Sequence, residues 1–340
     1  MTITGSPRGE LFLYRAPIQR KWRLQPNYSF DLLKKKDNFA IIILSKDMTY
    51  HLYRFFLVFI GCLPFRMIYY LSDVLYFLLY KVIGYRKDVV RKNLTESFPE
   101  KSEKEILKIE KDFYHSFSDI ILETCKMGSM STECMVNHMG YSNIDELDDV
   151  LRSGRSIALF LGHCANWEWV SSMPIHLNKK TVCAQIYHKL SNRELDKIML
   201  KSRAKQGAVN VEMRQTARFI NKMVTEDKTC IVGFIADQSP RKKDAKYYLK
   251  FLNHEVPVIT GPEKIAKHYD FEAWFVQPRR LRRGEYEATF IRMHDNPASL
   301  PDFELTDIYY KMLEETIRLH PELYLWTHKR FRYAKNTSNS

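Results

Sequence analysis

The stretch Ile157-Ala158-Leu159-Phe160-Leu161-Gly162-His163-Cys164-Ala165-Asn166-Trp167-Glu168 places five apolar residues directly before a glycine and a histidine. A short apolar run that ends at a glycine is typical of a buried strand. His163 would then stand at the mouth of that strand, with a glutamate five positions later. The stretch therefore predicts a buried strand with a polar site at its carboxyl end.

Strands and helices alternate outward from this stretch. We expect strands at Ile157–Leu161, Thr181–Tyr187, Val209–Val211, Cys230–Ala236, Tyr247–Leu252, Phe271–Val276 and Tyr286–Arg292. We expect helices at Ala165–Leu177, Arg193–Gln206, Thr216–Glu226, Gly261–Tyr269 and Leu305–His320. This order predicts an α/β fold with a mostly parallel central sheet flanked by helices. Ligands of such sheets bind beyond the carboxyl ends of the strands, which is where His163 is expected.

Two different segments precede the alternating part. Residues 86–150 have a helical pattern, in which Ser102 and Glu105 form a capping box and apolar residues recur at helical spacing. Residues 52–85 are strongly apolar, but Pro64 and Arg66 interrupt them. An uninterrupted span needs about 20 apolar residues. Three interpretations stay open for this segment: an anchor embedded in one leaflet, a kinked single span, and a soluble core helix.

Composition sets further limits. The 340 residues can form one sizeable core with an appendage, and the net charge of +13 calls for an anionic partner or a solvated basic surface. With 13% aromatic residues and the apolar segment near the N-terminus, an anionic membrane is favoured, and no nucleic-acid-binding motif is present. Six cysteines without a C-x-x-C pair indicate reduced thiols and not a disulfide framework or a zinc site.

His163 and Glu168 form the candidate catalytic pair. Five positions do not share one helix face, so we expect His163 in a loop and Glu168 in the first turn of the next helix. Glu168 can then accept the Nδ1 proton of His163 and leave Nε2 free to remove a hydroxyl proton, a step typically worth about 10²–10⁴-fold in rate. The alternative is a histidine that closes the strand by bonding a backbone carbonyl.

Two other kinds of site, a thiol nucleophile and a metal site, are less favoured at this position. Cys164 beside His163 allows a thiol nucleophile, but reactive cysteines need an electropositive, partly exposed setting. A metal site is not expected, because the chain has no H-E-x-x-H and the histidine and glutamate lack a third ligand at a recognisable spacing.

The segment Gly162–Glu168 resembles the signature of the bacterial lipid A late acyltransferases (lauroyl/myristoyl transferases), within the wider lysophospholipid acyltransferase group. Further boxes of this family follow in order: Arg91–Leu94 with Ser97–Glu100, Arg203 with Gly207, Ala236–Pro240, Gly261–Ala266 and His320–Phe331. Several separated boxes in the right order are more specific than any single one. The resemblance covers residues 50–332, approximately.

The resemblance implies an O-acyltransferase that moves a fatty acyl group from an acyl carrier protein or coenzyme A thioester to a hydroxyl of a lipid, most closely a lipid A precursor. It implies that His163 is the base, that Glu168 orients it and that Arg203 stabilises the oxyanion. It assigns substrate contacts to Asn166, Asp237 and Gln238, and it implies no metal or cofactor. From the residues alone, a surface helix charge is favoured for Arg203, and a cap for the turn before Pro240 is favoured for Asp237.

The same resemblance implies a layout and a location. We expect a poorly ordered leader or non-native start at 1–47, a membrane-anchor helical segment at 48–86, a catalytic domain at 87–332 and a disordered tail at 333–340. The catalytic domain would face the cytoplasm from the bacterial inner membrane, with an anionic membrane, an acyl donor and a lipid acceptor as partners and no nucleic acid.

Some features of the sequence do not decide which lipid accepts the acyl group. Relatives that make phospholipids usually carry an aspartate at the Glu168 position and an F-P-E-G-T-R box, which is absent here. Another glycolipid, an aminolipid or a lysophospholipid remains an alternative acceptor, and a lipid hydrolase with the same residue pair is an alternative function. The cluster Arg279, Arg280, Arg282 and Arg283 fits either the docking of an acidic carrier or phosphorylated sugar, or a solvated hairpin turn.

Overall fold

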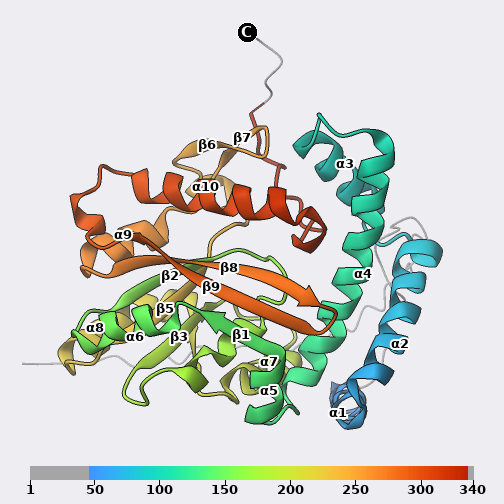
Figure 1. The fold of residues 1–340 in the computed structure, drawn as a ribbon, viewed down its shortest axis with the longest axis horizontal. Coiled ribbons are helices and arrows are strands. Elements are labelled where there is room, and N and C mark those ends of the chain that lie inside the picture. The colour runs from blue at the N-terminus through green and yellow to red at the C-terminus, as the bar shows by residue number, and fades with distance from the viewer. Residues whose placement is uncertain (1–45, 336–340) are drawn as a thin grey trace, which may run out of the picture. The chain divides into compact units, whose positions relative to one another are not determined.

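A computed structural model describes residues 46–335 and contains a seven-stranded sheet at its centre (Figure 1). Its order is β1-β9-β8-β2-β5-β3-β4, and all neighbouring pairs are parallel except β8 with β9. The strands are β1 (Met139–Ser142), β2 (Ile157–Leu161), β3 (Val182–Tyr187), β4 (Val209–Glu212), β5 (Cys230–Ile235), β8 (Glu272–Arg282) and β9 (Glu285–His294). The predicted α/β fold with a mostly parallel sheet is confirmed.

The apolar run of the opening stretch forms β2, which lies between β8 and β5 and is buried along its whole length. Its side chains alternate between two hydrophobic clusters, one on each face of the sheet. Ala158 and Phe160 belong to the cluster that also holds Leu313 of α10. Leu159 belongs to the other cluster, together with Leu147 of α6. Because both faces of the sheet are covered at β2, every side chain of this strand is buried, and all five positions are apolar.

Helices surround the sheet (Figure 1). They are α1 (Lys46–Cys62), α2 (Phe65–Tyr76), α3 (Lys87–Ser97), α4 (Glu103–Met127), α5 (Thr132–His138), α6 (Ile144–Arg152), α7 (Arg193–Ala204), α8 (Thr216–Thr225), α9 (Gly261–His268) and α10 (Glu304–Leu319). The predicted capping box begins α4, where the Ser102 side chain accepts from the Glu105 backbone and the Glu105 carboxylate accepts from the Ser102 backbone. Such a box removes two unsatisfied donors from the start of the helix.

The apolar segment near the N-terminus folds as two helices that meet at Pro64. After Pro64, α2 continues into a π-helical stretch, Phe77–Ile83, which ends at Gly84 in a left-handed conformation. Among residues 46–335, no single helix is both long and apolar enough to cross a bilayer, although the bent pair Phe65–Ile83 and Lys87–Ser97, which turns by 92°, passes by length and composition. α1 and α2 both pack against α4.

Three expectations need correction. The helix expected at Ala165–Leu177 is a turn followed by a 3-10 segment, Trp169–His176, because Ala165 has a φ of 48° and Pro174 interrupts the remainder. The strand expected at Tyr247–Leu252 pairs outside the central sheet, as β6 (Tyr248–Phe251) with β7 (His254–Pro257). The edge strand β1 was not predicted. The leader 1–47 and the tail 333–340 lie largely outside the described residues.

Candidate active site

His163 lies in the loop directly after β2, as predicted, and this loop is held from two sides. A Cβ on Gly162 would come within 2.5 Å of Leu313 Cδ1, so the glycine allows α10 to pack closely against the loop. On the other side, the Leu325 N–H donates to the His163 carbonyl at 3.1 Å and the Ala165 N–H donates to the Leu323 carbonyl at 2.9 Å. The C-terminal segment therefore fixes the backbone on which the histidine stands.

Asp237 is the acid that contacts the imidazole. His163 Nδ1 lies 2.7 Å from Asp237 Oδ1, and the His163 backbone N–H donates to Asp237 Oδ2 at 3.3 Å. The reason is the register of the sheet: Leu161 of β2 pairs with Ile235 of β5, so the residues two positions beyond each strand face one another. The expected hydrogen bond between Glu168 and Nδ1 is therefore wrong, because the partner comes from the neighbouring strand and not from the same loop.

The contact between His163 and Asp237 shifts the pKa of both groups. Burial lowers the pKa of His163, but the charge and the hydrogen bond of Asp237 outweigh it, so the pKa lies above its usual value of 6.5. Burial raises the pKa of Asp237, but the charge and hydrogen bonds of His163 outweigh it, so that pKa lies below its usual value of 3.8. An ionised Asp237 selects the tautomer with the proton on Nδ1, which leaves Nε2 of a neutral His163 as a base.

Glu168 has a different partner. Arg203 on α7 donates to both of its carboxylate oxygens, from Nε at 2.7 Å and from the terminal Nη2 at 2.5 Å. Both side chains are mostly buried, with 22% of Arg203 and 11% of Glu168 exposed. A two-pronged contact of this kind fixes the guanidinium in both position and plane. The structure thus brings Arg203 and Glu168 together, and it places both on the cavity that His163 also lines.

Gln238 and Asn166, the two amides expected to contact substrate, lie in different surroundings. Gln238 lines the cavity, and with the imidazole proton on Nδ1 its amide Nε2 donates to His163 Nε2 at 3.4 Å. Asn166 is buried and does not line the cavity; its Nδ2 donates to Glu123 Oε2 at 2.8 Å, and its Oδ1 accepts from the Trp169 N–H. The expectation of a substrate contact from Asn166 is therefore corrected, because its side chain holds the loop together.

The partner of Asn166, Glu123 on α4, was missed by the sequence reasoning. Besides Asn166, it accepts hydrogen bonds from the hydroxyls of Tyr69 and Tyr286. Burial and then the charge of Asp119 raise its pKa to about 7, against the lowering effect of the three hydrogen bonds. Its signal in the sequence was an acid three positions after Ile120, on the core face of an amphipathic helix.

The sequence predicts no role for His328, which lies within the C-terminal box His320–Phe331. Burial lowers its pKa to about 4, so this histidine is neutral at physiological pH. His328 therefore keeps the same charge over the pH range in which His163 gains or loses its proton.

The cavity beside His163 has a volume of about 740 Å³, within the size range of small-molecule sites. Polar residues on its lining include His163, Glu168, Arg203 and Gln238, and further charged residues such as Arg214, Arg241 and Lys264. Along the face of the central sheet, its apolar lining includes Leu159, Leu161, Ile231 and Ile235. A hydrocarbon chain with a reactive polar head fits a lining that combines these two kinds of residue.

The thiol chemistry considered for Cys164 does not fit the structure. Its side chain is buried and lies outside the cavity lining, and burial raises its pKa well above 9.0, so the thiol stays protonated. Within residues 46–335, no group of three or more histidine, cysteine, aspartate or glutamate side chains is arranged to hold a metal ion.

The arginine cluster lies at the end of β8 and in the turn to β9, and its members are matched with acids. Arg279 pairs with Glu287 and Arg282 with Glu285, while Arg280 and Arg283 both lie near the buried Asp119. Arg283 also bonds Asp73 of α2 at 2.6 Å. The cluster therefore lies at the hairpin and ties it to α2 and α4.

The family model described as bacterial lipid A biosynthesis acyltransferase matches residues 37–333, which is most of the chain. No curated protein matches the chain significantly.

Proposed function

Since this chain belongs to the bacterial lipid A biosynthesis acyltransferase family and is therefore an acyltransferase, we propose that it moves a fatty acyl group from an acyl thioester to a hydroxyl of a lipid A precursor, with His163 as general base. The observation that carries the proposal is a histidine whose Nδ1 is held by Asp237 and whose ring lines a cavity with an apolar interior. The donor is the thioester of an acyl carrier protein or of coenzyme A.

The steps follow from the geometry. Nε2 of neutral His163 accepts the proton of the acceptor hydroxyl while the oxygen attacks the thioester carbonyl carbon. The tetrahedral oxyanion then collapses and breaks the carbon–sulfur bond, and the imidazolium returns the proton to the departing thiolate. Asp237 stabilises the imidazolium in between, as the acid of a catalytic triad does. No group of the protein becomes acylated.

Arg203 is proposed to stabilise the oxyanion. Its guanidinium is held by Glu168 on the cavity lining, and hydrogen-bond donors that are already fixed in a buried site cost no reorganisation when the negative charge develops. In this proposal Glu168 acts through Arg203 and not through the imidazole.

The substitution Glu168→Gln tests this role. It removes the carboxylate that holds Arg203, and loss of one oxyanion donor costs about 10²–10³-fold in kcat. We expect a fall of that order, measured as initial rates of lipid acylation. Glu285→Gln is a matched control, because it breaks a two-pronged pair with Arg282 on the surface, and it should leave kcat unchanged. A normal rate for Glu168→Gln would contradict the proposed role of this pair.

The product identifies the reaction. Purified enzyme incubated with an acyl thioester and a lipid A precursor should yield, by mass spectrometry, a lipid heavier by one acyl group and one free thiol for each ester formed. Free fatty acid with unchanged lipid would instead indicate the hydrolase alternative.

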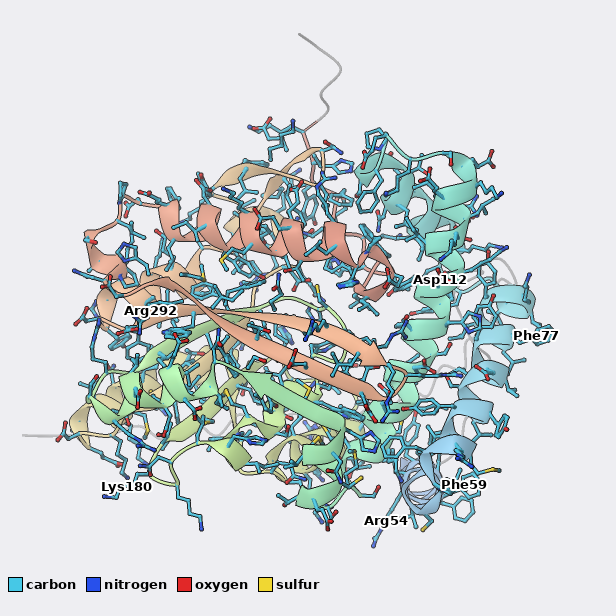
Figure 2. The ribbon with its side chains drawn as sticks, in the orientation of Figure 1. Arg54, Phe59, Phe77, Asp112, Lys180 and Arg292 are labelled. Atoms are coloured by element: carbon cyan, nitrogen blue, oxygen red, sulfur yellow. The ribbon has the colours of Figure 1, made fainter. Side chains whose placement is uncertain are left out.

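Membrane attachment is proposed to occur through α1, α2 and the π-helical stretch. The large apolar side chains exposed there are Tyr53, Phe55, Phe56, Val58, Phe59, Met67, Tyr70, Val74, Phe77, Leu78, Val82 and Ile83. Figure 2 shows Phe59 and Phe77 pointing away from α4, on the outer side of these helices. So many exposed apolar residues do not fit a soluble core helix, but they do fit an anchor that lies in one leaflet.

The double substitution Phe59→Glu with Phe77→Glu tests the attachment. Withdrawing two phenylalanines from the bilayer should lower the affinity for vesicles containing phosphatidylglycerol by about 100-fold or more, since burial of each contributes about 1.5–3 kcal/mol. Vesicle flotation measures it. Leu319→Glu is the control, because Leu319 is also exposed but lies at the end of α10. Equal binding by the double variant and the wild type would rule out this surface.

A further inference from the structure

Gly233 stands in the middle of β5, a strand with neighbours on both sides, where a glycine weakens the sheet. Neither its backbone nor its packing requires a glycine. Its φ is not positive, and a Cβ built there would meet only the Ala184 carbonyl oxygen, at an ordinary contact distance of 3.6 Å. This distinguishes it from Gly162, where a Cβ would collide with α10. What the missing side chain provides is open space on one face of the sheet.

That space is part of the cavity. In the register of the sheet, Gly233 lies between Leu159 of β2 and Gln185 of β3, and all three residues line the cavity. The rows on either side carry bulky side chains, with Ile235 toward His163 and Ile231 away from it. Gly233 is therefore a gap between the larger side chains of Leu159, Ile231 and Ile235 on the cavity floor.

The gap lies at a defined depth. Leu159, the β2 partner of Gly233, lies two residues before the end of β2, which corresponds to about 7 Å along the strand, and His163 stands in the loop beyond that end. An extended chain of single bonds advances about 1.1–1.2 Å per bond, so the strand part of this depth alone equals about six bonds. A fatty chain whose thioester carbon lies at His163 would place its distal methylenes over Gly233.

We propose that Gly233 determines the length of the fatty acyl chain that this enzyme transfers, because its missing side chain leaves room for the distal part of the chain. The inference rests on the proposed function, since it takes the cavity to be the site of the donor's acyl chain. A side chain at position 233 would fill part of the cavity from its floor while leaving His163, in the loop beyond the end of β2, unchanged.

The test compares Gly233→Leu with the wild type on a series of acyl thioesters from octanoyl to stearoyl, with a lipid A precursor as acceptor and kcat/KM as the measurement. We expect the variant to retain octanoyl transfer within about threefold and to lose about 100-fold or more on the longest chains, as expected for an overfilled hydrophobic pocket. Gly140→Leu is the matched control: it lies on β1, also leaves room for a Cβ, and is outside the cavity. It should keep the wild-type preference.

Three outcomes distinguish the possibilities. A shift toward shorter chains in Gly233→Leu alone supports the inference. An unchanged preference, or an equal loss on all chain lengths, overturns it while leaving the proposed acyl transfer intact. If leucine disrupts the sheet, Gly233→Ala replaces it, since the added methyl makes only an ordinary contact, and a smaller shift in the same direction is expected. A wild-type enzyme that transfers none of the chains would instead refute the proposed function.

Discussion

Replacing His163 by alanine is expected to abolish acyl transfer, with a fall in kcat of at least about 10²–10⁴-fold. The reason is that two polar neighbours on the cavity lining cannot take over its role: Glu168 is bound by Arg203, and Gln238 carries an amide. Initial rates of lipid acylation measure the effect. Vesicle binding should stay unchanged, because the exposed apolar side chains lie on α1, α2 and the stretch that follows.

A second histidine provides the control for this result. His176→Ala removes an imidazole at the end of the 3-10 segment, outside the cavity lining, and it should retain near-normal activity. Substantial activity in His163→Ala, at a level similar to that of His176→Ala, would show that His163 is not the base.

Replacing Asp237 by asparagine is expected to lower kcat by about 10³–10⁴-fold, because the analogous change in a catalytic triad costs about 10⁴-fold. The asparagine amide can donate to Nδ1 and so favour the tautomer with the proton on Nε2, which cannot act as a base. The fold should persist, since asparagine matches aspartate in shape, and thermal unfolding provides the check.

The same substitution is expected to move the pH dependence in a defined direction. In the wild type the pKa of His163 lies above 6.5, so activity rises with pH as the imidazole loses its proton. Without the charge of Asp237, burial is left to dominate, and burial lowers the pKa of a histidine. The acidic limb of the residual activity should therefore move to lower pH. A limb that stays in place or moves to higher pH would contradict the pairing.

The central part of the fold could be predicted from the sequence because its signals are local. Five apolar residues followed by Gly162 predicted β2 and the position of His163, and the capping box at Ser102 predicted the start of α4. The 3-10 segment Trp169–His176 was mistaken for an α-helix, although Pro174 lies inside it. The apolar pattern of this segment is compatible with a helix, but a proline inside an α-helix removes a backbone hydrogen bond.

The orienting acid could not be found in the same way. Glu168 was chosen because it lies near His163 along the chain, whereas Asp237 lies 74 positions away and reaches the imidazole only through the register of β2 with β5. Which strands are neighbours in a parallel sheet depends on packing between segments that lie far apart in the sequence. The family resemblance placed Asp237 among the site residues, but the contact that gives it a role is visible only in the fold.

The most direct test of the His163–Asp237 pair is an NMR titration of the His163 imidazole, with carbon-13-labelled histidine, in the wild type, Asp237→Asn and Glu168→Gln. The pairing predicts a pKa above 6.5 in the wild type, a pronounced fall in Asp237→Asn and a smaller fall in Glu168→Gln, whose charge also raises this pKa but without a hydrogen bond. A pKa that is insensitive to Asp237→Asn but falls markedly in Glu168→Gln would show that the neighbour along the chain, and not the residue across the sheet, controls the catalytic proton.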